Sequence, residues 1–248
     1  MRQIFAVYKR ELNMYFRSPV AYAIAFALLL FFGLLFSNSV SQGNGQATAD
    51  QVNFIPSVLT FLLFLVAPLL TMRLLAEETR EGTLEVLMTM PIRESQFIIG
   101  KFLAVWTYYT IILLLTIIYH VILASIGVPD AGRAFGTYLG AWLYGGATLA
   151  LTMIWSAVTE DQIVAAFLGA ATVLVLYLAE VAAGAISNLP NANPALGNFI
   201  RELGFQAHYE TTLLQGVIRA EDILYFVFMI IAALFITTRI VEVRRWRS

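Results

Sequence analysis

Long apolar runs alternate with short polar segments along this chain, and the pattern predicts an all-α integral membrane protein. A bilayer core requires about 20 apolar residues per helix, and six windows of the sequence approach that length. Each span has to be helical, because backbone groups cannot be left unpaired in lipid. The predicted spans are about 20–36, 55–75, 102–126, 135–158, 162–186 and 222–241.

The first residues do not form a span but carry an amphipathic pattern. Apolar and aromatic residues recur at helical spacing, at Ile4, Tyr8, Leu12, Tyr15 and Phe16. The polar and positively charged residues fall mostly elsewhere, at Lys9, Arg10, Asn13 and Arg17. This predicts a helix over 1–18 that lies in the membrane interface. Pro19 marks the turn into the first span. The alternative is that the first span starts early with a charged flank.

The segment 187–221, between the last two spans, mixes polar and apolar residues. Its apolar stretches, around 199–205 and 213–218, are too short to cross a membrane. They predict short re-entrant or surface helices on the outer side. The alternative is an ordinary loop packed on the membrane surface.

Composition supports the membrane class. Hydrophobic residues make up 60% of the 248 residues and charged residues only 12%, whereas soluble domains are about one quarter charged. The mean hydropathy is +0.78. The sequence has no cysteine, which excludes disulfides, a thiolate nucleophile and cysteine-ligated metal.

The distribution of Lys and Arg predicts the orientation, because these residues gather on the cytoplasmic side of membrane proteins. In a six-span arrangement one side has Arg2, Lys9, Arg10, Arg17, Arg73, Arg80, Arg93, Lys101, Arg239, Arg244, Arg245 and Arg247, and the other has Arg133, Arg201 and Arg219. We therefore expect both termini and the loop after the second span to be cytoplasmic.

That loop begins with the unusually charged stretch AEETREGTLEVLMTMPI, residues 76–92. We expect the second helix to continue past the membrane and to stop at Gly82, since glycine favours the left-handed position after a helix end. Thr83 is placed to cap a new short helix from residue 84 to about 90, ended by Pro91. Glu85 suits the positive end of that helix.

The predicted short helix needs a cover for its apolar side chains, because so short a helix is marginal alone in water. The flanking carboxylates argue against deep insertion beside anionic lipid. Leu87, Met88 and Met90 suit a groove, since methionine adapts to irregular surfaces. We therefore expect another protein to bind this helix.

Residues 68–104, PLLTMRLLAEETREGTLEVLMTMPIRESQFIIGKFLA, resemble the hallmark of type-2 ABC export permeases. The matching positions are Pro68, Thr71-Met72-Arg73, Glu77-Glu78, Gly82-Thr83, Glu85, Leu87, Pro91 and Gly100-Lys101. Residues 9–22 resemble the family's first span, and residues 208–246 resemble the subgroup of gliding-motility permeases. One departure is Arg93, where the family often has Ser or Thr; Ser95 lies just beyond.

The resemblance implies a single transmembrane permease domain over 1–248 in the inner (cytoplasmic) membrane. Two permease subunits, identical or homologous, would pair with two ATP-binding subunits. The segment 77–97 would couple them through Glu77, Glu78, Gly82, Thr83, Glu85, Leu87 and Met88. No cofactor is expected in this chain, and ATP and Mg²⁺ would bind the partner. The sequence has no G-x-x-x-x-G-K-[ST] motif, so the chain is not expected to be an enzyme.

Other polar residues are weaker candidates. Glu160 and Asp161, in the turn between the fourth and fifth spans, are a second possible ATPase contact or simply a polar turn. Glu180 and His120 are candidates for a polar site within the membrane. Equally, Glu180 could reach the headgroups, and His120 could hydrogen-bond a neighbour. No metal site is expected, since no second histidine stands at ligand spacing.

Small residues mark two close-packing faces. Gly136 and Gly140 lie in the fourth span, and Ala165, Ala166, Gly169 and Ala170 lie in the fifth. Such faces predict tight helix packing and not specifically a dimer. Because spans one and five line the subunit interface in the resembling family, the second set is the candidate dimer seam.

Two other functions remain open from the residues alone. A self-contained secondary carrier or channel usually shows internal repeats and broken helices, whereas charges here lie almost entirely outside the spans. An intramembrane enzyme would need a nucleophile–base pair or metal ligands at membrane depth. Only His120 and Glu180 are available for that role.

Overall fold

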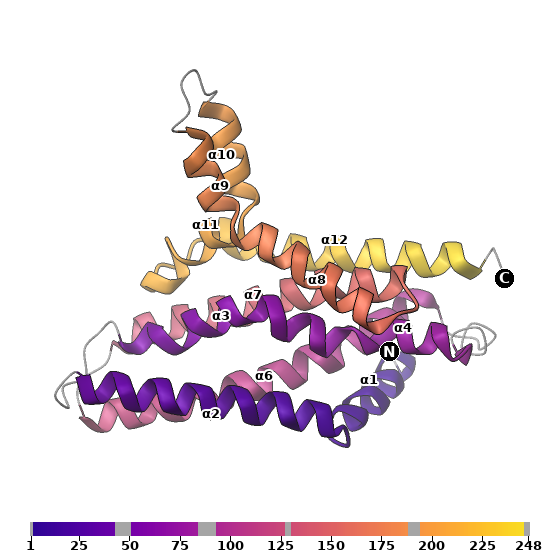
Figure 1. Ribbon diagram of the computed structural model, residues 1–248, viewed down its shortest axis with the longest axis horizontal. Coiled ribbons are helices and arrows are strands. Elements are labelled where there is room, and N and C mark those ends of the chain that lie inside the picture. The colour runs from indigo at the N-terminus through magenta and orange to yellow at the C-terminus, as the bar shows by residue number, and fades with distance from the viewer. Residues whose placement is uncertain (1, 43–50, 84–92, 127–129, 188–193, 246–248) are drawn as a thin grey trace.

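The computed structural model describes residues 2–42, 51–83, 93–126, 130–187 and 194–245, and every regular element in this part is helical (Figure 1). The all-helical class predicted from the apolar runs is therefore confirmed. The helices are α1 (Arg2–Tyr15), α2 (Pro19–Gln42), α3 (Gln51–Thr71), α4 (Arg73–Arg80), α6 (Glu94–Ile126), α7 (Ala131–Val158), α8 (Gln162–Tyr177), α9 (Ala179–Ser187), α10 (Pro194–Leu203), α11 (Phe205–Tyr209), the 3-10 turn η1 (Leu213–Gln215) and α12 (Ala220–Arg245).

Five helices in this part of the chain are long and apolar enough to cross a membrane. They are α2, α3 continued by α4, α6, α7 and α12. The predicted fifth span, 162–186, is not straight: α8 and α9 meet at Leu178 with a bend of 45°. The number of candidate spans is six if this bent pair counts as one, and five otherwise.

Helix α7 lies in the middle of the bundle, and its glycines let neighbouring side chains approach its backbone. A Cβ on Gly145 would lie 2.1 Å from the ring of Tyr109, and one on Gly136 would lie 2.8 Å from the Cα of Gly216. The Tyr109 hydroxyl donates to the Ala141 carbonyl at 2.7 Å. The tight packing predicted for Gly136 and Gly140 is confirmed, and it serves contacts within the chain.

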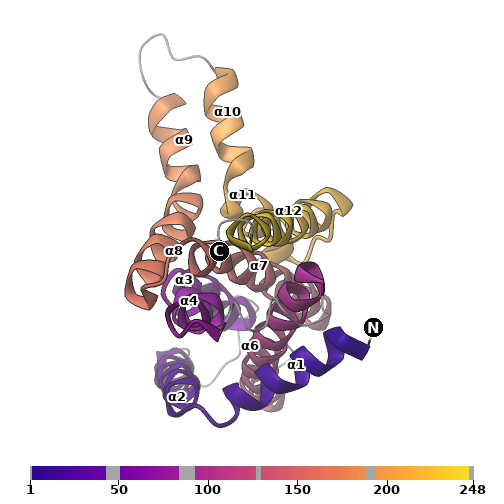
Figure 2. The same ribbon diagram turned by 90° about the vertical axis from the view of Figure 1, so that its right-hand side faces the viewer.

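Helix α1 covers most of the stretch with the amphipathic pattern and crosses the beginning of α6 (Figure 2). Its buried face contains Val7 and Glu11. A Cβ on Gly100 of α6 would lie 2.8 Å from the Cβ of Val7, so only glycine permits this approach. The interfacial position of α1 stays a prediction.

Helix α2 is the least enclosed of the long helices. Tyr108 and Tyr119 of α6 attach it by donating to the carbonyls of Ala21 and Leu29 at 2.7 and 2.8 Å. Much of its remaining surface is apolar and exposed, as at Phe26 (68% exposed). Such a surface requires lipid or another chain as its cover.

Helices α9 and α10 pack against each other and project from the side of the bundle (Figures 1 and 2). The region predicted to hold short helices, 187–221, contains α10, α11 and η1. Pro194 begins α10, a position where proline's missing N–H costs nothing. Whether these helices lie on the membrane or re-enter it stays a prediction.

The two ends of the described chain lie at the same end of the bundle as α4 (Figure 1). Arg244, near the end of α12, donates from Nη2 to the Val158 carbonyl at 2.6 Å, where α7 ends. The far end of the bundle holds Arg133, in the first turn of α7, and Arg219, directly before α12. This end is the outer side in the predicted orientation. This arrangement agrees with an even number of spans.

Candidate functional site

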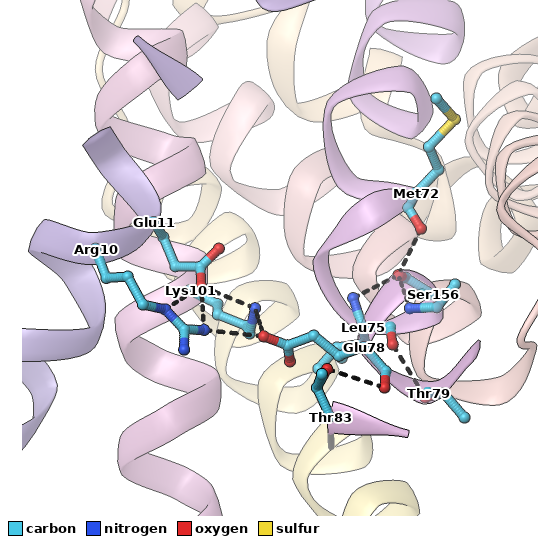
Figure 3. Close-up of polar contacts among 10 residues, drawn as sticks. Arg10, Glu11, Met72, Leu75, Glu78, Thr79, Thr83, Lys101 and Ser156 are labelled. Atoms are coloured by element: carbon cyan, nitrogen blue, oxygen red, sulfur yellow. Dashed lines mark hydrogen bonds and ion pairs between the residues drawn. The ribbon is translucent and has the colours of Figure 1, made fainter. Parts of the chain in front are cut away.

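The second candidate span continues beyond α3 into α4, and the joint between them is at Met72. Ser156 of α7 inserts its hydroxyl there (Figure 3). The Ser156 Oγ donates to the Met72 carbonyl at 2.9 Å and accepts from the Leu75 and Ala76 amides at 3.0 and 3.1 Å. A side chain inserted into the helical hydrogen-bond ladder is a recognised cause of a helix break. The break between α3 and α4 is therefore connected to α7 by hydrogen bonds of Ser156.

Buried threonines extend this connection into the bundle. The Thr71 hydroxyl donates to Thr152 Oγ1 at 2.9 Å, and the Thr152 hydroxyl is within 2.9 Å of the Thr148 carbonyl. Thr148, Thr152 and Ser156 are spaced four residues apart and are at most 1% exposed. They form one polar line along α7, which faces α3 and α4.

Helix α4 ends where the sequence predicts. The Gly82 amide donates to the Thr79 carbonyl, and Gly82 adopts φ of 68°, the left-handed conformation that glycine favours. The Thr83 hydroxyl donates to the Glu78 carbonyl at 3.3 Å and so completes the end of α4. The predicted capping by Thr83 of a following helix, and Glu85, Leu87 and Met88, depend on 84–92, which lie outside the described residues.

Four charged side chains meet beside α4 (Figure 3). Lys101 Nζ lies 3.0 Å from Glu11 Oε1 and 2.9 Å from Glu78 Oε1. Arg10 Nη2 lies 2.6 Å from Glu11 Oε1 and 2.9 Å from Glu78 Oε1. We call these four residues the ion network. It joins α1, α4 and α6.

The ion network is largely shielded from water. The side chains of Lys101 and Glu11 are 2% and 4% exposed, Glu78 is 15% exposed, and Arg10 closes the outer side at 45%. Two cations and two anions leave no net charge buried. Burial alone lowers the pKa of Arg10, but its bonds to Glu11 and Glu78 outweigh this and raise the pKa above its ordinary value. Removing one partner would leave an uncompensated charge, which is strongly unfavourable.

The ion network distinguishes the three carboxylates at the end of α4, of which Glu77 and Glu78 were predicted to contact an ATPase. Glu78 points into the network, whereas Glu77 is partly exposed and Glu81 is exposed. Neither Glu77 nor Glu81 forms a side-chain hydrogen bond or ion pair within the described part of the chain. Of these three carboxylates, therefore, only Glu77 and Glu81 remain free for an outside contact.

Arg10, Glu11 and Lys101 were not predicted from the sequence to belong to a common site. One signal was present: Glu11 falls on the same helical face as Ile4 and Val7, and a carboxylate on an apolar face requires a partner. A second signal was the pair Gly100-Lys101. Gly100 allows α1 to approach α6, and Lys101 is thereby brought to Glu11.

The turn between α7 and α8 contains the second candidate contact. Asp161 caps α8, with Oδ1 accepting from the Ile163 and Val164 amides at 2.7 and 3.2 Å. The Thr159 hydroxyl donates to the Asp161 carbonyl at 2.8 Å. Asp161 thus has a local structural role, whereas Glu160 is exposed and forms no side-chain hydrogen bond or ion pair within the described residues.

The small residues of α8 do not share one environment. Ala165 and Gly169 are buried within the chain, and a Cβ on Gly169 would lie 3.2 Å from Thr152 of α7 and 3.4 Å from Pro68 of α3. Ala166 and Ala170 are partly exposed. The exposed face of α8 instead presents large side chains, which include Ile163 (65%), Phe167 (73%) and Val175 (68%).

His120 and Glu180 do not form one site. His120 lies on α6 and Glu180 in the first turn of α9, and the two views place these helices on opposite sides of α7 (Figures 1 and 2). No cluster of three potential metal ligands occurs in the residues that the structure describes. Glu180 instead lies near Glu210, and their repulsion adds to burial in raising the pKa of Glu210.

Comparison with known proteins identifies the family. The family described as "ABC-2 family transporter protein" matches residues 37–205, more than half of the chain. No curated protein gives a match to the chain. The family match covers α3, α4 and α6, and two members of the ion network, Glu78 of α4 and Lys101 of α6, lie within it. The chain therefore belongs to the ABC-2 family transporter proteins, as a multi-pass membrane permease component of an ABC transporter.

Proposed function

We propose that this chain is the permease subunit of an ATP-driven exporter and that the predicted segment 77–97 receives motion from a separate ATP-binding subunit. Its part 81–93, which connects α4 to α6, is called the coupling segment below. One observation carries the proposal: Glu78 and Lys101, on the two sides of the coupling segment, are 2.9 Å apart, with Lys101 buried and Glu78 only 15% exposed. Both helix ends beside the segment are therefore tied together. A push on the segment moves them as a unit.

The contacts around the ion network give this motion a path. Glu78 belongs to α4, Lys101 to α6, and Glu11 to α1. Ser156 connects α4 to α7 through three hydrogen bonds. Separating buried charges costs several kcal/mol per ion in typical proteins (about 3–5 when one partner is lost). Rigid-body displacement of these helices is therefore easier than opening the network.

The partner contacts follow from which residues are free. We propose that Thr83, Glu85, Leu87 and Met88 face the ATP-binding subunit, that Gly82 supplies the turn, and that Glu77 acts from α4 beside the segment rather than as a direct contact. Glu160 forms a second, smaller contact. Glu78 contributes from inside, by holding α4 to α6. Two ATP-binding subunits bind ATP and Mg²⁺, and this chain supplies no nucleotide ligand.

We propose that two permease subunits, identical or homologous, form the transport path. The exposed faces of α2 and α8 are the candidate seam, because both present large apolar side chains such as Phe26 and Phe167. Ala166 and Ala170 border that face, whereas Ala165 and Gly169 pack inside the chain. The seam thus uses the side of α8 opposite to its most buried small residues.

The proposed location is the inner (cytoplasmic) membrane, with both termini cytoplasmic. Lys and Arg concentrate at the end of the bundle that holds α4 and the termini, and this supports the orientation. The likeness of residues 208–246 to gliding-motility permeases makes that subgroup the proposed one. A self-contained carrier or channel is the alternative, and it requires no ATP-binding partner.

The test is purification of the tagged chain with its ATP-binding partner from native membranes, followed by reconstitution in proteoliposomes. We expect Glu85→Lys and Leu87→Asp to weaken association and to lower permease-dependent ATPase activity by tenfold or more, about 1.4 kcal/mol of coupling. Membrane insertion should be unchanged.

Glu221→Lys is the matched control, because Glu221 is exposed and lies at the start of α12, away from α4. It should leave association and activity at the wild-type level. Unchanged association and ATPase activity in both coupling variants would contradict the proposal, and transport without any ATP-binding chain would favour the carrier.

A further inference from the structure

A cavity of about 720 Å³ lies between the α1–α2 turn and the α3–α4 helix, and the four residues of the ion network form part of its lining. This volume falls within the roughly 300–1,000 Å³ of typical ligand pockets. The cavity has two chemically different ends. Its lining includes apolar side chains from α2 and α3 and charged side chains from α4 and from the turn between α1 and α2.

The apolar end is formed by Val20 and Ile24 of α2 and by Leu69 and Leu70 of α3. These residues lie within candidate membrane spans. A ligand at this end is therefore in contact with the hydrocarbon region or its border. The cavity fits an amphiphile that enters from the bilayer rather than a small ion from water.

The charged end has a definite order. Arg73, Glu77 and Glu81 follow one another at intervals of four residues, so they share one face of the α4 helix, and all three line the cavity. At 1.5 Å per residue, each step is about 6 Å further from the membrane. Arg17, from the turn after α1, lines the cavity as a second cation.

These four side chains are available to a ligand. Arg17, Arg73 and Glu81 are exposed and Glu77 is partly exposed. Within the described residues none of them forms a side-chain hydrogen bond or ion pair, in contrast to the neighbouring ion network. The cavity therefore offers two unpaired cations near the apolar end and two unpaired carboxylates beyond them.

We propose that this cavity binds the headgroup and upper acyl chain of a phosphatidylethanolamine from the leaflet at the α4 end. The phosphate of this lipid lies next to the glycerol, where Arg17 and Arg73 can donate charge-assisted hydrogen bonds to it. Its ammonium group lies further out, where Glu77 and Glu81 accept from it. The order of charges along α4 matches the order in the headgroup.

The same order disfavours other common phospholipids. Phosphatidylglycerol satisfies the arginines but brings no cation to Glu77 and Glu81. The quaternary amine of phosphatidylcholine has no N–H to donate to these carboxylates. A free phosphate would leave the apolar end of the cavity empty. The site therefore discriminates by the amine as well as by the phosphate.

The experiment is native mass spectrometry of the delipidated, detergent-purified full chain, incubated with an equimolar mixture of the three phospholipids. The wild-type chain should retain phosphatidylethanolamine preferentially. The double variant Arg17→Gln/Arg73→Gln should bind every phospholipid about tenfold more weakly or worse, since charge-assisted hydrogen bonds are lost. Glu77→Gln/Glu81→Gln should keep phospholipid binding but lose the preference for the ethanolamine headgroup.

Arg80→Gln is the matched control, because Arg80 is exposed on the same helix but does not line the cavity. Ile24→Trp is the second test, since it fills the apolar end without changing any charge. It should also reduce phosphatidylethanolamine binding. Glycerophosphoethanolamine, the water-soluble headgroup, should not displace the lipid at millimolar concentration.

Three results would overturn the proposal. One is equal lipid retention by Arg17→Gln/Arg73→Gln and Arg80→Gln in folded protein. Another is equal binding of all three phospholipids by the wild-type chain. The third is displacement by glycerophosphoethanolamine as effectively as by the lipid, which would assign the cavity to a soluble ligand.

Discussion

The Nζ of Lys101 lies 2.9 Å from Oε1 of Glu78, and this ion pair joins the beginning of α6 to the last turn of α4. The coupling segment runs between these two residues in the sequence. Glu11 of α1 shares the same lysine at 3.0 Å. Three helix ends therefore meet at one ammonium group, and this gives the first prediction.

Lys101→Met should destabilise the protein more than any surface change. The variant leaves the buried carboxylates of Glu11 and Glu78 with only the partly exposed Arg10, and such a loss typically costs about 3–5 kcal/mol. Thermal unfolding in detergent measures it. Lys9→Met, at an exposed position of α1, should change the midpoint little. The double variant Lys101→Met/Glu78→Gln should be less damaged than the sum of the single changes. An unchanged midpoint for Lys101→Met would show that the network carries no stability.

Ser156→Ala should loosen the joint between α3 and α4. The hydroxyl serves the Met72 carbonyl and the Leu75 and Ala76 amides, and leaving buried polar groups unsatisfied costs about 1–3 kcal/mol each. Hydrogen exchange at the Leu75 and Ala76 amides should become faster, and the thermal midpoint should fall. Ser125→Ala removes only a bond to the same helix and serves as the control. Wild-type exchange at both amides would contradict this role of Ser156.

Gly100→Ala should push α1 away from α6. The added Cβ would lie 2.8 Å from Val7 Cβ and 3.0 Å from the Ile4 carbonyl oxygen, and overpacking of this kind typically costs about 1–3 kcal/mol. Limited proteolysis within α1 should become faster. Gly184→Ala is the matched change, because no atom in the part of the chain that the structure describes lies within 4 Å of its added Cβ. Equal proteolysis of the two variants would mean that α1 does not depend on this contact.

Gly82→Val should impair coupling without weakening the bundle. Gly82 adopts φ of 68°, and a left-handed residue with a Cβ costs roughly 1–2 kcal/mol. No atom of the described residues lies within 4 Å of the added Cβ, so the effect is conformational. ATPase stimulation in proteoliposomes should fall in Gly82→Val and be largely kept in Gly82→Asn, since asparagine tolerates this conformation. Equal activity of the two variants would contradict a required left-handed turn.

Glu210→Gln should change the pH dependence of stability. Burial, and then repulsion by Glu180, raise the pKa of Glu210 above the ordinary 4.5. A raised carboxyl pKa stabilises the folded state below about pH 4.5, and this contribution is lost as the pH rises through the folded-state pKa. The thermal unfolding midpoint of the wild type should therefore fall relative to that of Glu210→Gln as the pH rises from about 4 to about 8. This range brackets the transition, which begins at roughly pH 4.5. Glu221→Gln, an exposed position, should run parallel to the wild type. Parallel curves for Glu210→Gln would contradict the shift.

The sequence alone determined the helical membrane class and the end of α4. Long apolar runs in lipid permit only helices here, because every backbone group needs an internal partner. Gly82 ends α4 because its left-handed conformation is a local property that neighbouring residues hardly influence. The close packing at Gly136 also followed from residue size alone.

Only the tertiary structure decided which polar groups pair and which remain free. Glu77 and Glu78 are adjacent in sequence, yet one is partly exposed and the other lies in the ion network, because consecutive helical residues point in different directions. The packing partners of Gly169 were likewise decided by the tertiary structure, since Thr152 and Pro68 belong to other helices. Hydrophobic periodicity predicts that a side chain is buried, but it does not identify the residues that pack against it. Partners distant in the sequence, such as Glu11 and Lys101, are brought together only when the helices pack.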